Sequence, residues 1–169
     1  ASANKSGAFG TRWLTRFSVF NPHFDYPLVV SITFVPTGGA QGIEELVEVP
    51  PNSLAWSDNL LGDLYGVSDS SGALLVATFA EDNPGVANTV IARSFLVTSD
   101  TFNNSPSGTY GQTIPGVWAG LLDYDFDQIS SVAHNIRNLS QEGWRTNIGA
   151  VNLGRCSVTV WATVYDADG

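Results

Sequence analysis

The stretch LVVSITFV, residues 28–35, alternates its side chains with a period of two. One side of an extended chain carries only large apolar groups, namely Leu28, Val30, Ile32 and Phe34. Because successive side chains of a β-strand point to opposite faces, this stretch predicts a strand whose apolar side lies in a core. The stretch CSVTVWATVY, residues 156–165, has the same alternation and predicts a second such strand.

Further strands are predicted where this period recurs between turn-forming residues. The segments are rich in β-branched and aromatic residues and span residues 13–20, 43–49, 71–79, 89–98, 109–114 and 131–140. Clusters of Gly, Pro, Asn and Asp separate them. Short, regularly spaced strands without long helical periodicity predict an all-β fold, an antiparallel β-sandwich of the Ig-like or jelly-roll-like kind.

One short helix is predicted near residues 57–65. Ser57 is a suitable N-cap, leucines recur at helical spacing through Leu64, and Gly66 is a suitable residue to end the helix. We expect this helix to cover one end of the sandwich.

The charge balance argues against two classes of partner. The 169-residue chain has seven basic residues, of which only Lys5 is a lysine, against 16 acidic residues, and its net charge is −9. Scattered cations do not form the basic surface that nucleic acids and anionic membranes require. No apolar run approaches the roughly 20 residues of a membrane span. We therefore expect no nucleic-acid partner and no membrane insertion.

The rest of the composition favours an extracellular or cell-surface location. The opening ASANKSGAFG is small and polar, as in a mature protein after removal of a signal peptide. Lysine is scarce and methionine is absent, while Ser, Thr, Asn and Gly are abundant. Cys156 is the single cysteine, so an intramolecular disulfide is impossible, and we interpret it as a small apolar residue beside a strand.

An internal repeat organises the chain. The segment 13–21 matches the segment 144–152 at an offset of 131, from Trp13 and Trp144 to Asn21 and Asn152. The segment 30–39 matches the segment 160–169 at an offset of 130. We therefore interpret residues 1–12 as an N-terminal extension and 13–169 as a single β-sandwich domain. Residues 13–143 are one repeat unit, and 144–169 are the first hairpin of a second unit, either packed back or exchanged with a neighbouring molecule.

The order of several motifs resembles a known kind of module. Strand motifs around WLTRFSVFN and VSITFVPTGG are followed by VEVPPN, NLLGDLYG, SGALLV, GTYGQTIPGV and WRTNIGAVN. Over residues 13–169 this order is similar to uncharacterised β-sandwich repeat modules of large secreted bacterial proteins. The resemblance implies a secreted or surface-exposed accessory module, often in tandem and sometimes beside hydrolase domains, and it transfers no catalytic residue. The chain departs from the motif order in the longer segment 118–130.

A candidate metal site lies in that segment. Asp123, Asp125 and Asp127 are two residues apart, so in a strand their carboxylates project from one face, which suits calcium. The EF-hand template fails, since Gln128 stands at its sixth position and His134 at its twelfth. The alternative interpretation is a solvated strand face with Tyr124 and Phe126 turned inward. No other cofactor is predicted.

Aromatic residues of the same region suggest a ligand site. Trp118 and Tyr124, together with Trp161 on the last predicted strand, are candidates for an apolar platform that binds glycans. Sandwich interiors use the same residues, and buried aromatic rings are the commoner case, but the sequence leaves both alternatives open.

Catalytic motifs are not recognisable. His23 and His134 lack a nucleophile motif, and no spacing rule selects a pair among the 16 acidic residues. We predict a non-enzymatic secreted or cell-surface β-sandwich module for adhesion, spacing or binding. Two alternatives stay open: a subunit of an extracellular fibre that assembles by β-strand exchange through its sheet edges, and a carbohydrate-binding accessory domain of a secreted hydrolase.

Overall fold

A computed structural model gives the fold of the chain. It describes residues 2–7, 10–79, 93–105, 108–113, 116, 150, 152 and 159–163. The chain divides into two compact units, Ala1–Ala119 and Gly120–Gly169, whereas the sequence repeat placed a boundary between residues 143 and 144. All strands of the described residues belong to the first unit.

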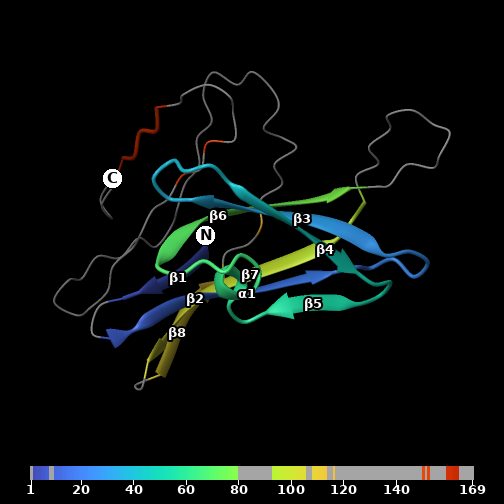
Figure 1. Cartoon of the computed structure of the whole chain (residues 1–169), viewed down its shortest axis with the longest axis horizontal. Helices are drawn as coiled ribbons and strands as arrows, with labels where there is room; N and C mark the ends of the chain where they lie inside the picture. Colours follow the sequence, from blue (N-terminus) through green and yellow to red (C-terminus); the bar gives the residue numbers. More distant parts are fainter. Residues whose placement is uncertain are drawn as a thin grey trace, which may run out of the picture. The chain divides into compact units, whose positions relative to one another are not determined.

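The first unit consists of antiparallel strands and one short helix among the residues described (Figure 1). Its elements are β1 (Ser2–Ser6), β2 (Arg12–Phe20), β3 (Leu28–Pro36), β4 (Ile43–Val49), β5 (Leu54–Ser57), α1 (Leu60–Asp63), β6 (Ser70–Phe79), β7 (Leu96–Ser105) and β8 (Gly108–Thr113). The strand order is β4-β3-β6-β1-β2-β7-β8, and β5 also pairs with β2. Every pairing is antiparallel. The predicted all-β fold with one short helix is confirmed.

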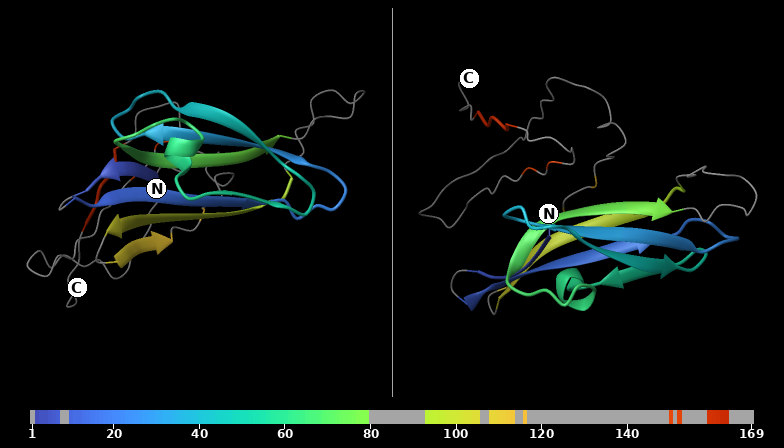
Figure 2. Two further views of the ribbon diagram at one scale, coloured as in Figure 1. Left: turned by 60° about the horizontal axis from the view of Figure 1, so that its bottom comes forward. Right: turned by 45° about the horizontal axis from the view of Figure 1, so that its top comes forward.

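The described strands form a curled half-barrel, and they do not show the antiparallel sandwich that we predicted in closed form. The sheet has two halves, one of β4, β3 and β6 and the other of β5, β2, β7 and β8. Strand β1 joins them, because Ser2–Asn4 pair with β6 while Lys5 and Ser6 pair with β2. Figure 2 shows β1 running between β6 and β2. The Ig-like or jelly-roll-like arrangement stays a prediction.

Residues 1–12 contribute a strand to the sheet, although the sequence assigned them to an extension outside the domain. The backbone amide of Ala3 donates to Thr15 Oγ1 at 2.6 Å, and Asn4 Nδ2 donates to the Val67 carbonyl at 2.8 Å. Ser2, Ala3 and Asn4 are all buried. These hydrogen bonds hold the strand in place. Its sequence has no apolar alternation, and for that reason it was not predicted as a strand.

Strands β2 and β3 do not form the hairpin expected from the sequence. Strand β2 pairs with β1, β5 and β7, while β3 pairs with β4 and β6. The two strands lie in opposite halves of the sheet, and the loop between them crosses from one half to the other. A second copy of this segment would therefore be an arch whose strands each need other partners.

The core lies on the concave side of the sheet, under α1. It contains the side predicted from LVVSITFV and the alternate residues of β2, and its buried members are Phe17, Val19, Leu28, Val30, Ile32, Val49 and Leu60. Phe34 and Leu61 are buried as well. The prediction that one face of residues 28–35 packs in a core is thus confirmed.

The structure confirms some of the other predicted strands and differs from others. The predictions for 43–49, 71–79 and 109–114 match β4, β6 and β8 within one residue at each end, whereas β7 begins at Leu96 instead of residue 89. Strand β5 was not predicted. The prediction for 131–140 lies outside the described residues. Residues 159–163 are exposed and lie outside any strand, contrary to the strand predicted over 156–165.

Helix α1 is shorter than predicted and has a different cap. Asn59, and not Ser57, is the N-cap, and its side chain accepts from the amide of Gly62. Ser57 Oγ instead accepts from the amide of Asn59 and donates to Asp63 Oδ2 at 2.6 Å. Ser57 therefore fixes the turn that leads from β5 into the helix.

Tyr65 fixes the end of the helical segment. Its hydroxyl donates to the Ile32 carbonyl in β3 at 2.6 Å. Burial raises the pKa of the Tyr65 hydroxyl well above its usual value of 10.0, and the negative charge of Glu45 raises it further. The neutral hydroxyl is the form that this hydrogen bond requires.

Candidate binding face

The convex side of β5, β2 and β7 is the candidate functional site. The residues of β2 that alternate with its core residues point to this side, and the strand pairing sets their neighbours. We call this surface the Trp56 face and define it by Arg16, Ser18, Phe20, Leu54, Trp56, Asp58, Leu96, Thr98 and Asp100.

Trp56 is the most prominent group of this face, with 66% of its surface exposed. It stands opposite Ser18 on β2, and Ser18 stands opposite Thr98 on β7. The Ser18 and Thr98 hydroxyls share a hydrogen bond of 2.7 Å. Because the Ser18 and Thr98 side chains are small, the indole ring of Trp56 projects beyond them and leaves a polar strip beside it.

An apolar row lies on one side of Trp56. Leu54 pairs with Phe20, and Phe20 pairs with Leu96. Leu54 and Leu96 are both more than half exposed. Together with the indole they give this end of the face a largely apolar surface.

A charged row lies on the other side. Arg16 Nε donates to Asp58 Oδ1 at 2.6 Å, and both side chains are more than half exposed. Arg16 also pairs with Asp100 in the strand register, and its guanidinium lies 5.3 Å from the centroid of the Phe102 ring. Asp100 Oδ1 in turn accepts from the Thr113 hydroxyl. This row therefore offers hydrogen-bond donors and acceptors in fixed positions to a ligand that stacks on the indole.

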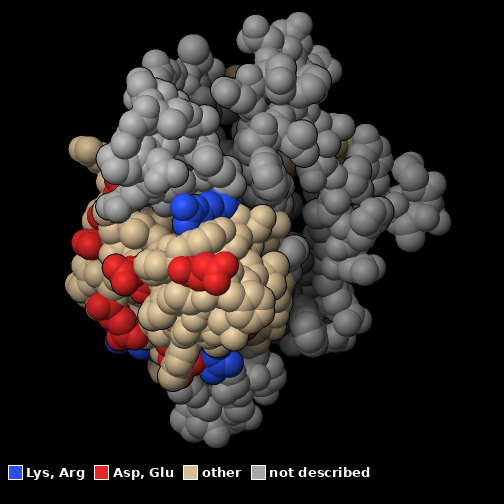
Figure 3. Space-filling model, turned by 90° about the vertical axis from the view of Figure 1, so that its right-hand side faces the viewer, with Lys and Arg blue, Asp and Glu red and all other residues tan. Residues whose placement is uncertain are grey.

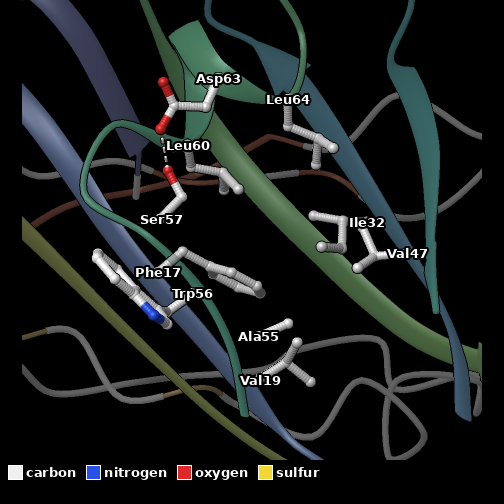
Figure 4. A pocket seen from close by; sticks show the side chains of 10 residues that line it. All are labelled: Phe17, Val19, Ile32, Val47, Ala55, Trp56, Ser57, Leu60, Asp63 and Leu64. Carbon is white, nitrogen blue, oxygen red and sulfur yellow. Dashed lines mark hydrogen bonds between the residues drawn. The ribbon is translucent and has the colours of Figure 1, made fainter. Parts of the chain in front are cut away.

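A cavity lies on the concave side, between α1, β5 and the β3–β4 pair. Its volume is about 210 Å³, with Phe17, Val19 and Ala55 on one side and Ile32 and Val47 on the other (Figure 4). Leu60 and Leu64 of the helical segment and Trp56 complete its apolar lining. Ser57 and Asp63, joined by their hydrogen bond, are the polar groups of this lining. We call it the α1 cavity.

Acidic groups are prominent on the surface of the described residues. Figure 3 shows acidic patches spread over the face in view, with fewer basic ones. The one salt bridge among the described residues joins Arg16 to Asp58. Most of the acidic groups of the described part therefore face solvent without a salt-bridge partner, and they disfavour anionic ligands.

Most site residues predicted from the sequence lie outside the described residues. These are the proposed calcium ligands Asp123, Asp125 and Asp127 and the proposed glycan contacts Trp118 and Tyr124. Trp161 is 88% exposed, which agrees with the exposed alternative for that ring. Among the described residues no cluster of three His, Cys, Asp or Glu side chains has the arrangement of a metal site.

Trp56 was missed in the sequence. The available signal was the alternation of LAWS, in which Leu54 and Trp56 share one side, but the segment is only four residues long and leads into the predicted helix.

No protein-family model, curated protein or solved structure matches the chain. In the part of the chain that the structure describes, no helix has the length and hydrophobicity needed to cross a membrane.

Proposed function

We propose that the chain is a non-enzymatic, extracellular binding module and that its Trp56 face binds a neutral polysaccharide. The single observation that carries this proposal is the exposed indole of Trp56 on an open sheet face, flanked by hydrogen-bonding groups. Secretion and the accessory role follow the interpretation of the composition and the resemblance to secreted repeat modules.

The face suits a sugar because a pyranose ring has an apolar side and a polar rim. The indole offers a flat apolar surface for ring stacking. Arg16 and Asp58 already hold each other in place, so a sugar hydroxyl meets oriented charged groups at a lower entropic cost than free side chains would impose.

A neutral polymer is favoured over a charged one. The guanidinium of Arg16 is neutralised by Asp58, and Asp100 lies opposite Arg16 across the strand pair. The whole chain carries a net charge of −9, so a polyuronate would be repelled.

Affinity electrophoresis tests the proposal. The chain is run through native gels that contain β-glucan, xylan, starch or polygalacturonate, and we expect retardation by at least one of the three neutral polymers. The variant Trp56→Ala should lose this retardation. Phe24→Ala is the matched control, because Phe24 is also an exposed aromatic residue, 77% accessible, in the loop that follows β2.

Two outcomes would contradict a carbohydrate-binding Trp56 face. One is retardation that is the same in Trp56→Ala and in the parent chain. The other is an absence of retardation by every neutral polymer while the anionic polymer does retard the chain.

The free sheet edges favour a second candidate function, a fibre subunit that assembles by β-strand exchange. Strands β4 and β8 end the described sheet, and β5 pairs on one side with β2. An added strand at β4 or β5 would extend the half-barrel towards a closed sandwich. Glu44, Glu45 and Glu48 make β4 an unfavourable edge for this, so we expect β5 to be the site.

Sedimentation velocity over a hundredfold range of protein concentration tests this second candidate. Assembly predicts a mass that grows with concentration. A constant monomeric mass over the whole range would rule out strand exchange between molecules.

A further inference from the structure

The α1 cavity has the properties of a ligand site on the concave side of the sheet, and Trp56 is the one residue that it shares with the Trp56 face. Eight of the ten residues that line it are apolar, and they come from β2, β3, β4, β5 and the α1 segment. Its volume of about 210 Å³ is enough for a small ligand, since an engineered apolar cavity of roughly 150 Å³ binds benzene. A water molecule needs two or more polar partners, which this lining provides only at Ser57 and Asp63.

Hydrogen bonds fix the elements that surround the cavity. The Tyr65 hydroxyl ties the helical segment to the Ile32 carbonyl of β3, and the Asn59 cap begins the helix. On the other side, β5 is fixed through its pairing with β2.

The polar groups of the lining have a defined chemistry. Ser57 Oγ donates to Asp63 Oδ2, so one carboxylate oxygen is occupied and oriented. Asp63 is exposed and has no salt-bridge partner among the described residues. An ordered carboxylate beside an apolar chamber complements a positive charge carried on an apolar body.

We propose that the α1 cavity binds a small amphiphilic cation. The apolar body of the ligand lies among Phe17, Ile32, Val47 and Leu60, and its ammonium group binds the Asp63 carboxylate. A single alkyl chain of about six carbons or one aromatic ring fits the volume. Anionic amphiphiles are excluded by the same carboxylate and by the net negative charge of the chain.

A titration series followed by two-dimensional NMR tests this site on the full chain. The probes are hexylammonium, hexanol and hexanoate, which share the chain length and differ in the charge of the head group. We expect hexylammonium to shift the amide signals of residues around the cavity, such as Val47 and Leu64, with hexanol weaker and hexanoate weakest. The variant Asp63→Asn keeps an acceptor for Ser57 and should weaken hexylammonium about threefold without changing hexanol.

A cavity-filling variant is the second arm. Ala55→Leu places three extra carbon atoms in the cavity and should abolish binding of hexylammonium and hexanol alike. If this variant does not fold, Val47→Ile fills part of the same space, keeps a β-branched side chain in β4 and should weaken both probes. Val47 lies in β4, outside the Trp56 face, so polysaccharide retardation should persist in Val47→Ile.

The outcomes separate the two proposals. Unchanged hexylammonium binding in the cavity-filling variants, or hexanoate binding as tight as hexylammonium binding, would overturn the cation site and leave the polysaccharide proposal standing. Trp56 borders the α1 cavity as well as the Trp56 face, so the cavity proposal is decided by the Ala55 and Val47 variants and not by Trp56→Ala.

Discussion

Replacing Asn21 by alanine should lower the free energy of unfolding by about 3–5 kcal/mol. Asn21 is fully buried where β2 ends. Its Nδ2 donates to the carbonyls of Tyr26, Val49 and Pro50 at 2.9–3.1 Å, and its Oδ1 accepts from the amide of His23 at 2.9 Å. One side chain thus joins the loop after β2 to the loop after β4.

The magnitude follows from these hydrogen bonds. Each of them contributes about 1 kcal/mol net, and a buried group left without a partner costs about 1–3 kcal/mol. Alanine removes all four hydrogen bonds, and partial relaxation of the exposed loop atoms offsets some of the cost, which gives a total of about 3–5 kcal/mol. This is a large part of the roughly 5–15 kcal/mol by which domains are usually stable.

Equilibrium urea unfolding of the parent chain and of each variant measures the destabilisation. Asn152→Ala is the control, because the sequence repeat aligns Asn152 with Asn21 although Asn152 is exposed, and its effect should stay below about 1 kcal/mol. Asn21→Asp should be worse than alanine at neutral pH, since it turns a carboxylate towards three carbonyl oxygens, and should recover as the pH falls. A destabilisation below about 1 kcal/mol in Asn21→Ala would refute the argument.

The remaining predictions concern the sheet and the helical segment. Gly72→Ala should cost about 2–3 kcal/mol in urea unfolding, because a Cβ at position 72 would overlap the Val35 carbonyl oxygen, whereas Gly116→Ala, with open space around it, should be neutral. The raised pKa of Tyr65 adds stability that is fully present below the usual tyrosine pKa of about 10 and is lost as the pH rises above it. Thermal unfolding of Tyr65→Phe should therefore depend less on pH between about 9 and 11 than that of the parent chain, and equal slopes would contradict the burial of this hydroxyl.

Strong alternation made part of the fold predictable. Strand β3 was located within one residue because its inner positions are apolar, and the ends of both β3 and β4 are marked by Pro or Gly. Strand β7 was placed too early, since the inner face of its second half carries the polar side chains of Ser99, Thr101 and Asn103. The side chains alternate between two faces there as well, but neither face is apolar enough for the alternation to be recognised in the sequence.

Other features depend on contacts between distant residues. Nothing in the local sequence of β1 indicates a buried strand, because Asn4 is held there by Arg12 and by the Val67 carbonyl. The exposure of Trp56 likewise depends on small neighbours in two other strands, Ser18 and Thr98. Sequence periodicity predicts which side chains share one face of a single strand, whereas a binding face is formed by residues of several strands.

The two halves of the half-barrel are joined through β1, and this connection has a kinetic consequence. Ser6 and its partner Asp69 are 63 residues apart, so a long loop must close before the halves can meet. The pairing between β2 and β7 is also distant in sequence, with Thr15 and Thr101 separated by 86 residues. Folding rates fall as contacts become more distant along the chain. We therefore expect β3, β4 and β6 to pair early, and the β2–β7 pairing together with the docking of β1 to limit the rate at which the native sheet appears.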